Sequence, residues 1–152
     1  MRSAADPTER RRRAMSAFAQ APAGFLEARW PSLADGRTIV PVRGPEVGLV
    51  MVRGRTGGGG AAFNLGEASA TRASVRLANG PVGHAMILGR DLEKARHAAA
   101  FDALWQIDTC QAAVEREVVA EIERLIAAAD GQRAEETAAT KVDFFTMARG
   151  ED

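Results

Sequence analysis

The sequence has few of the side chains from which metal and catalytic centres are usually built. Its 152 residues include one cysteine, two histidines and no tyrosine. Because Cys110 is alone, an internal disulfide and a thiolate-rich zinc or iron-sulfur site are excluded within one chain. A metal ion would need ligands beyond His84 and His97, so we expect no metal and no cofactor bound by this chain alone.

Long apolar runs are also missing. No segment approaches the roughly 20 uncharged apolar residues that cross a bilayer, and no apolar stretch of a signal peptide follows the N-terminal arginines. We therefore expect a cytoplasmic protein with no membrane partner. A hydrophobic fraction of 46% over this length fits one compact domain covering residues 1–152.

An excess of charge of either sign is lacking too, and a net charge of zero argues against a nucleic-acid partner. The charges are nevertheless uneven along the chain. Positions 37 to 90 contain seven arginines and two acidic residues, whereas the chain from position 114 onward contains ten acidic residues and five basic ones. Arg10 to Arg13, without interleaved aromatic residues, are interpreted as a solvated run.

Helix signals are present near the N-terminus. Asp6-Pro7-Thr8-Glu9 supplies a capping oxygen, a proline and an early acid, which predict a helix from Pro7 to about Gln20. Pro22 predicts a second, short helix, which Pro31 and Asp35-Gly36 are expected to stop.

Helix signals return after the middle of the chain. Asp91 is a capping residue and predicts a helix to about Gln106, with His97 at its surface. Apolar residues at helical spacing predict another helix over 111–129, on which acidic residues cover the exposed side. The helix is able to continue to residue 140.

The segment between these helices is rich in β-branched residues. Segments 38–43 and 46–55, separated by Gly44-Pro45, predict a hairpin whose second strand is apolar on both faces and central in a sheet. Asn79-Gly80 predicts a second hairpin with a two-residue type I′ turn. This register pairs Val75 with His84 on a buried face and leaves Arg72 and Arg76 on the other.

These elements predict a single α+β domain in which N-terminal and C-terminal helices pack on an antiparallel β-sheet. The helices are expected at about 7–35 and 91–140 and the sheet at about 38–89. Residues 141–152 form a tail. Its apolar residues, Phe144, Phe145 and Met147, would either fold back on the chain's own core or dock on a neighbour, and we take them as candidate partner contacts.

Arginines are the candidate ligand-binding residues. Arg72 and Arg76 share a strand face and would present two guanidinium groups to a polyanion such as a triphosphate, with Arg53 and Arg90 as further candidates. The alternative is a solvated face, or ion pairs with the acidic C-terminal helix. The glycines at 57–60 lack the Gly-Lys-Ser/Thr ending of a phosphate-binding Walker loop. No catalytic triad can be assembled, so the catalytic residues are unknown.

Several segments, in order from Gly48 to Gly150, together resemble the G subunit of the phosphonate carbon-phosphorus lyase system. Only packing and loop length depart from the family pattern, at Trp105 and in the four-glycine run. The matching segments are Gly48-Leu49-Val50, Arg53 with Gly57-Gly58, Phe63-Asn64-Leu65-Gly66-Glu67, Thr71-Arg72, Val75-Arg76-Leu77, Gly83, Gly89-Arg90-Asp91, Asp102-Ala103-Leu104 with Gln106, and Val142-Asp143-Phe144-Phe145-Thr146-Met147 with Arg149-Gly150.

The resemblance implies a subunit of a transferase in phosphonate catabolism. It implies that the complex displaces adenine from MgATP with a phosphonate, which requires the H, I and L subunits as well. A stable core of G, H, I and J subunits around a twofold axis is also implied, in which the iron-sulfur cluster and S-adenosylmethionine belong to the J subunit. The family supplies no catalytic residue to transfer to this chain.

Three classes of function remain open from the sequence. The chain is either a structural or substrate-positioning subunit, which we favour, or an autonomous enzyme that turns over ATP by itself. The third class is a free regulatory module that binds a phosphorylated ligand, which would raise the melting temperature of the isolated chain.

Overall fold

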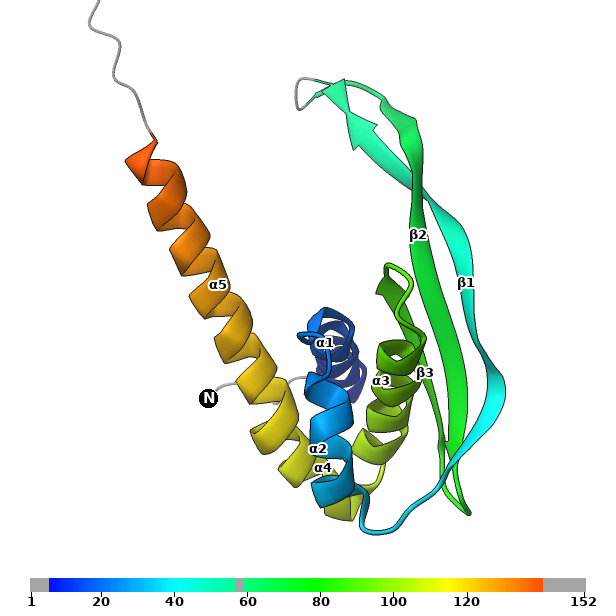
Figure 1. The fold of residues 1–152 in the computed structure, drawn as a ribbon. Helices are drawn as coiled ribbons and strands as arrows, with labels where there is room; N and C mark the ends of the chain where they lie inside the picture. The colour runs from blue at the N-terminus through cyan, green and yellow to red at the C-terminus, as the bar shows by residue number, and fades with distance from the viewer. Residues whose placement is uncertain (1–5, 57–58, 141–152) are drawn as a thin grey trace, which may run out of the picture.

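A computed structural model describes residues 6–56 and 59–140. Within these residues three strands form one antiparallel sheet in the order β1-β2-β3, and the helices pack against one of its faces (Figure 1). The α+β fold class is confirmed. The elements in chain order are α1 (Pro7–Gln20), α2 (Phe25–Ala34), β1 (Ile39–Arg55), β2 (Ala62–Leu77), β3 (Val82–Leu88), α3 (Leu92–Trp105), α4 (Asp108–Val114), the π-helical turn η2 (Glu115–Val119) and α5 (Ala120–Ala139).

The helices follow their local signals closely. Asp6 accepts a hydrogen bond from the Thr8 N–H at 3.3 Å, and Asp91 accepts one from the Lys94 N–H at 2.9 Å, so both predicted caps are confirmed. Pro31 lies inside α2 and does not end it. The helix ends instead at Asp35 and Gly36, whose φ angles of 48° and 72° are left-handed.

The prediction of a hairpin with its turn at Gly44-Pro45 is wrong. Residues 39–55 form one strand that pairs with β2 from Ile39, opposite Leu77, to Arg55, opposite Ala62. At Gly44-Pro45 the pairing with β2 shifts in register, as it does at a β-bulge, and the strand does not turn back. This is possible because the residues before and after Gly44-Pro45 both pair with β2. β1 is consequently an edge strand, and β2 is the central one.

The second hairpin is present, but its register differs from the predicted one by one residue. Ser74, and not Val75, lies opposite His84. Three residues, 78–80, separate Leu77 from Pro81, whose carbonyl accepts the Leu77 N–H at 3.2 Å. Of these three only Asn79 has a positive φ, 56°, whereas a type I′ turn needs two such residues. The shift places His84 on the exposed face of the sheet instead of the buried one.

Helix α3 lies at the centre of the core. Phe101 and Leu104 are fully buried, and the Trp30 ring meets the Phe101 ring edge-on at a centroid distance of 5.4 Å. His97, predicted at the helix surface, is buried next to Trp30, and its Nδ1 atom is hydrogen-bonded to the Glu93 carbonyl at 2.9 Å. That prediction failed because α2 covers the side of α3 that carries His97.

Two limbs extend from this helical body (Figure 1). Pairing with β3 ends at Ala70 and Leu88, so residues 49–55 and 62–69 continue as a two-stranded ribbon, which we call the arm. On the other side of the molecule, residues 127–139 of α5 are exposed and form the second limb. In residues 6–56 and 59–140, no helix combines the length and the apolar character that a bilayer crossing requires.

Candidate functional site

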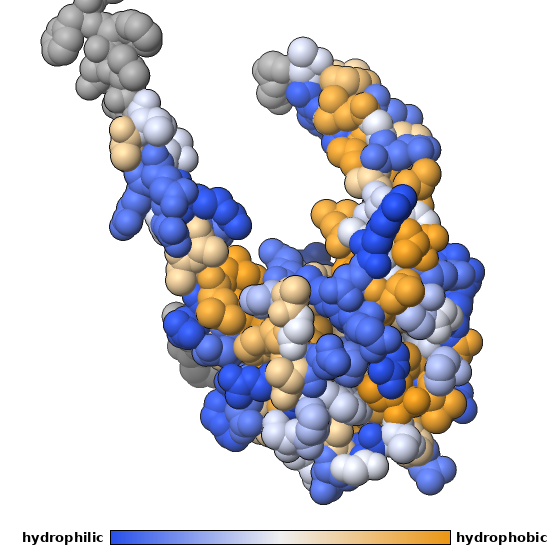
Figure 2. Space-filling view, viewed as in Figure 1, coloured by the Kyte–Doolittle hydropathy of each residue, from blue (hydrophilic) through white to orange (hydrophobic). Residues whose placement is uncertain are grey.

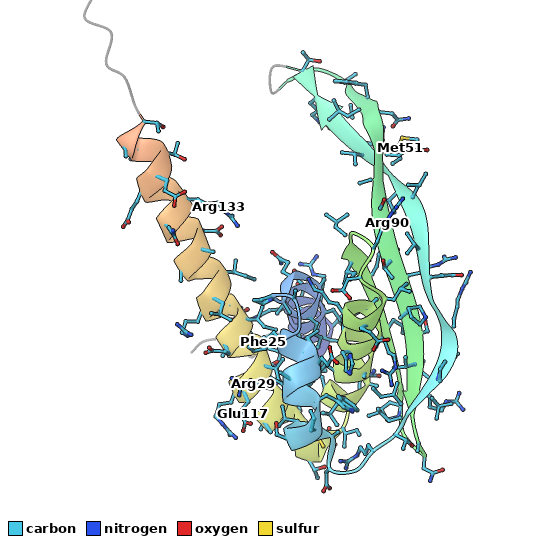
Figure 3. All side chains as sticks on the ribbon, in the orientation of Figure 1. Phe25, Arg29, Met51, Arg90, Glu117 and Arg133 are labelled. Atoms are coloured by element: carbon cyan, nitrogen blue, oxygen red, sulfur yellow. The ribbon has the colours of Figure 1, made fainter. Side chains whose placement is uncertain are left out.

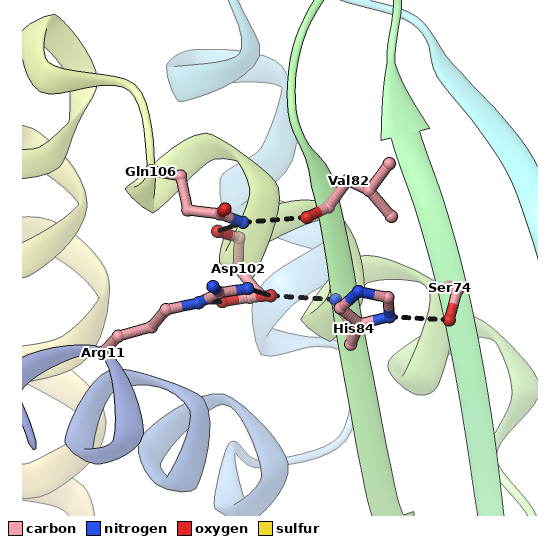
Figure 4. Close-up of polar contacts among 6 residues, drawn as sticks. All are labelled: Arg11, Ser74, Val82, His84, Asp102 and Gln106. Atoms are coloured by element: carbon pink, nitrogen blue, oxygen red, sulfur yellow. Dashed lines mark hydrogen bonds and ion pairs between the residues drawn. The ribbon is translucent and has the colours of Figure 1, made fainter. Parts of the chain in front are cut away.

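A buried carboxylate fastens the sheet to the helices (Figure 4). Asp102 of α3 has an exposed fraction of 1%, and its two oxygens accept hydrogen bonds from Arg11 Nε and Nη2 at 2.9 and 2.8 Å. The backbone N–H of His84 donates to the same carboxylate at 2.8 Å. This hydrogen bonding raises the pKa of Arg11 above its usual value. One side chain therefore joins α1, α3 and β3.

A second pair of contacts holds β3 on α3. Gln106 Nε2 donates to the Val82 carbonyl at 2.9 Å, and Gly83 lies directly against the backbone of α3 at Ala99 and Ala103. A side chain at position 83 would occupy the space of that backbone, so the close approach requires glycine. These contacts fix the position of β3, and with it His84.

The arginine run near the N-terminus is solvated as predicted at Arg10, Arg12 and Arg13, whereas Arg11 is half-buried. Arg11 bonds Asp102, and Arg13 forms ion pairs with Glu115 and Glu123 at the start of the C-terminal helices. Two glutamates of the acidic C-terminal third are therefore paired with an arginine of α1. Sequence reasoning missed this cluster, although Asp102 stands out as a carboxylate within an otherwise apolar helix face.

The sheet face opposite the helices, here called the outer face, carries the predicted arginines. Arg72, Ser74 and Arg76 alternate with the buried side chains of β2, so the shared face of Arg72 and Arg76 agrees with the structure. His84 joins them, because Ser74 Oγ lies 2.8 Å from His84 Nδ1. Among the hydrogen bonds of residues 6–56 and 59–140, no carboxylate bonds the His84 ring. Within the described residues the pair therefore lacks the orienting acid of a triad.

Arg72 already has a carboxylate partner on the outer face. Its Nε lies 2.6 Å from Glu46 Oε1, which also accepts a hydrogen bond from Arg43 Nε at 2.9 Å. Hydrogen bonding from Arg72 and Arg43 lowers the pKa of Glu46, which stays ionised at neutral pH. Glu46 and Arg72 also line a hollow of about 250 Å³, together with Gly48, Leu49 and Ala70 among others. The partner of Arg72 is thus on β1 and not in the acidic C-terminal helix.

Arg53 and Arg90 lie apart from this pair. Arg53 is opposite Asn64, twelve positions along β2 from Arg76, which corresponds to about 40 Å of strand. Arg90 follows β3 and lies beside β2, above the N-terminal end of α3 (Figure 3). In the part of the chain that the structure describes, Arg53, Arg76 and Arg90 form no ion pair within 4.0 Å. The four candidates therefore do not meet in one pocket of this chain.

The remaining points from the sequence concern a metal site, the glycine run at 57–60 and the apolar tail, and the structure describes them only in part. The described residues contain no group of three histidine, cysteine or acidic side chains able to hold a metal ion. Two of the four glycines, at 57 and 58, lie outside the described residues, as does the tail with Phe144, Phe145 and Met147.

The chain matches the family described as "Phosphonate metabolism protein PhnG" over residues 9–150. A relative from Rhizobium meliloti (strain 1021), the alpha-D-ribose 1-methylphosphonate 5-triphosphate synthase subunit PhnG, is 53% identical over 145 residues. The aligned region covers 93% of this chain and 90% of that relative. These matches define a protein of phosphonate metabolism. The chain belongs to the PhnG family, which confirms the resemblance seen in the sequence.

Proposed function

We propose that this chain is the G subunit of an alpha-D-ribose 1-methylphosphonate 5-triphosphate synthase. The complex would transfer a phosphonate onto the ribose of ATP and release adenine. The observation that carries the proposal is the 53% identity to a subunit of that synthase across 93% of the chain.

The proposed partners are the I, H and J subunits, in a core with twofold symmetry, and the L subunit in the same reaction. MgATP and the phosphonate are substrates of the complex, while the iron-sulfur cluster and S-adenosylmethionine would belong to the J subunit. The chain itself would have a structural or substrate-positioning role. Phe144, Phe145 and Met147 remain proposed contacts to a neighbouring subunit.

The outer face suggests what the positioning role would be. Arg76 and Arg72, whose Nε pairs with Glu46, flank Ser74 and the His84 ring, so guanidinium, hydroxyl and imidazole groups all face one patch of surface. Guanidinium groups bind phosphate oxygens in a bidentate manner and offset their charge. Such a patch would hold the triphosphate at a subunit junction. Arg53 and Arg90 would join it only where a partner closes the distance along the sheet.

Neutralising the negative charge of the triphosphate would help the proposed reaction. An anionic phosphonate oxygen would form a bond to C1 of the ribose as the bond from C1 to adenine breaks, and adenine would leave with a proton. The nucleophile and the triphosphate are both anions, which repel each other. Cations that neutralise the triphosphate would lower this repulsion without taking part in the bond changes.

Replacing Arg72 or Arg76 with alanine should lower phosphonate-to-ATP transfer by the purified complex by about tenfold to a hundredfold, because a hydrogen bond to a charged group contributes about 1.5–3 kcal/mol. Adenine release, followed by chromatography, measures the loss. The complex should stay intact on a sizing column. The control is Arg116→Ala, which removes an exposed arginine whose ion-pair partner among the described residues is Glu117. Unchanged transfer in both outer-face variants would remove the anion site from the proposal.

Complementation tests the proposed function as a whole. A Rhizobium meliloti strain that lacks its G subunit should not grow on methylphosphonate as the sole source of phosphorus, and this chain should restore growth. A well-expressed chain that fails to restore growth would contradict the proposal. Growth on inorganic phosphate serves as the control for general fitness.

A further inference from the structure

The sheet face that packs on the helices continues past them onto the arm. In the body this face buries Ala73, Val75 and Leu77. By strand alternation and pairing, the same face of the arm carries apolar side chains that no helix covers (Figure 2). These side chains, Leu49 and Met51 with exposed fractions of 63% and 53%, define the inner face of the arm together with Ser69 and Glu67, which lie opposite them on β2.

Such an arm is poorly suited to stand in water alone. An isolated two-stranded ribbon is marginally stable, and contiguous exposed apolar surface usually marks an interaction site. The edge of β1 that faces away from β2 has no strand partner within the described residues. The inner face therefore has the character of a buried sheet face, but no helix of this chain's helical body covers it.

The charges near the arm indicate the chemistry of that layer. Arg53 and Arg55 lie near the tip and Arg90 lies at the base, and in residues 6–56 and 59–140 none has a carboxylate within 4.0 Å. Glu67, which lies opposite Met51 on the inner face, is the single acidic residue of the arm. A segment that covers the inner face would gain ion pairs by bringing carboxylates to these arginines.

Both limbs restrict what can reach the inner face. Figure 2 shows an open hollow between the arm and the α5 limb, so the covering segment has to fit between them. A second arm from another copy would bring the same unneutralised arginines together, which repel. An apolar, acidic segment from a different polypeptide fits this surface better.

We infer that the inner face of the arm receives an apolar segment, bearing carboxylates, from another subunit of the synthase. The inference rests on the proposed function, because it takes the partner from the same complex. It adds the surface of this chain that is used, residues 49–55 and 62–69, and the chemistry of the segment that covers it.

The test is affinity purification of the tagged full-length chain after co-expression with the other synthase subunits. Leu49→Asp and Met51→Asp, alone and combined, place a carboxylate in the proposed contact. The combined variant should bind the partner about thirtyfold more weakly or worse, because a central apolar contact typically contributes 2 kcal/mol or more. Since both positions are exposed, the melting temperature of the isolated chain should not change.

Two matched variants separate contact from charge. Ala28→Asp adds the same charge at an exposed position of α2, and Leu49→Met keeps an apolar side chain on the arm; both should bind the partner as the wild type does. Equal binding by the wild type and the combined arm variant would overturn the inference. So would a wild-type homodimer that the combined variant abolishes, since the occupant would then be a second copy. Failure of the wild type to bind any subunit would instead contradict the proposed function.

Discussion

Replacing Gly83 with alanine should lower the free energy of unfolding by about 3 kcal/mol or more, because the added methyl group would overlap the backbone of α3. It would meet the Ala99 carbonyl and the Ala103 N–H closer than any van der Waals contact allows, and the Ala103 Cβ at 2.9 Å. Neither backbone group can move without displacing the central helix of the core. Denaturant unfolding of the isolated chain, followed by circular dichroism, measures the change.

The matched control is Gly66→Ala in the same sheet. A Cβ at position 66 meets nothing within 4 Å, so stability should change by no more than about 0.5 kcal/mol. If Gly83→Ala were as stable as Gly66→Ala, the close packing of β3 on α3 would be contradicted.

Replacing Asp102 with alanine should cost about 3 kcal/mol of stability. The change leaves the Arg11 guanidinium and the His84 N–H without their acceptor, and loss of one partner of a buried ion pair typically costs about 3–5 kcal/mol. We expect the lower end because the Arg11 side chain is 34% exposed and water replaces part of the interaction. Unfolding measurements at neutral pH test this value.

Two further variants show whether the cost comes from this contact. Asp108→Ala removes an exposed carboxylate at the start of α4 and should change stability by less than about 0.5 kcal/mol. Arg11→Ala combined with Asp102→Ala should destabilise by less than the two single changes added together, because the two side chains share one interaction. Simple additivity would mean that the ion pair contributes no coupling energy.

The parts of the fold that depend on local signals were predictable from the sequence. Caps at Asp6 and Asp91 and the apolar spacing of the C-terminal helices involve residues within one or two turns of each other. The strands were harder because pairing joins distant residues. Gly44-Pro45 has the composition of a turn, yet β1 pairs with a strand about 30 residues further along the chain, and this long ladder overrides the local preference.

The candidate site was predicted in outline and missed in detail. Alternation placed Arg72 and Arg76 together, and this survives a one-residue error because both lie on β2. The same error reversed the environment of His84, since shifting a strand by one position exchanges its two faces. The contact of Arg11 with Asp102 joins residues 91 positions apart, and no periodic pattern in the chain reports such a pair.

The most direct test of the central claim, that this chain serves a synthase as one of its subunits, compares the purified chain with the assembled complex. Each is given MgATP and methylphosphonate, and adenine release is measured over time. We predict no release by the chain alone and steady release by the complex, which stops when this chain is omitted. Adenine release by the chain alone, or undiminished release without it, would contradict the claim.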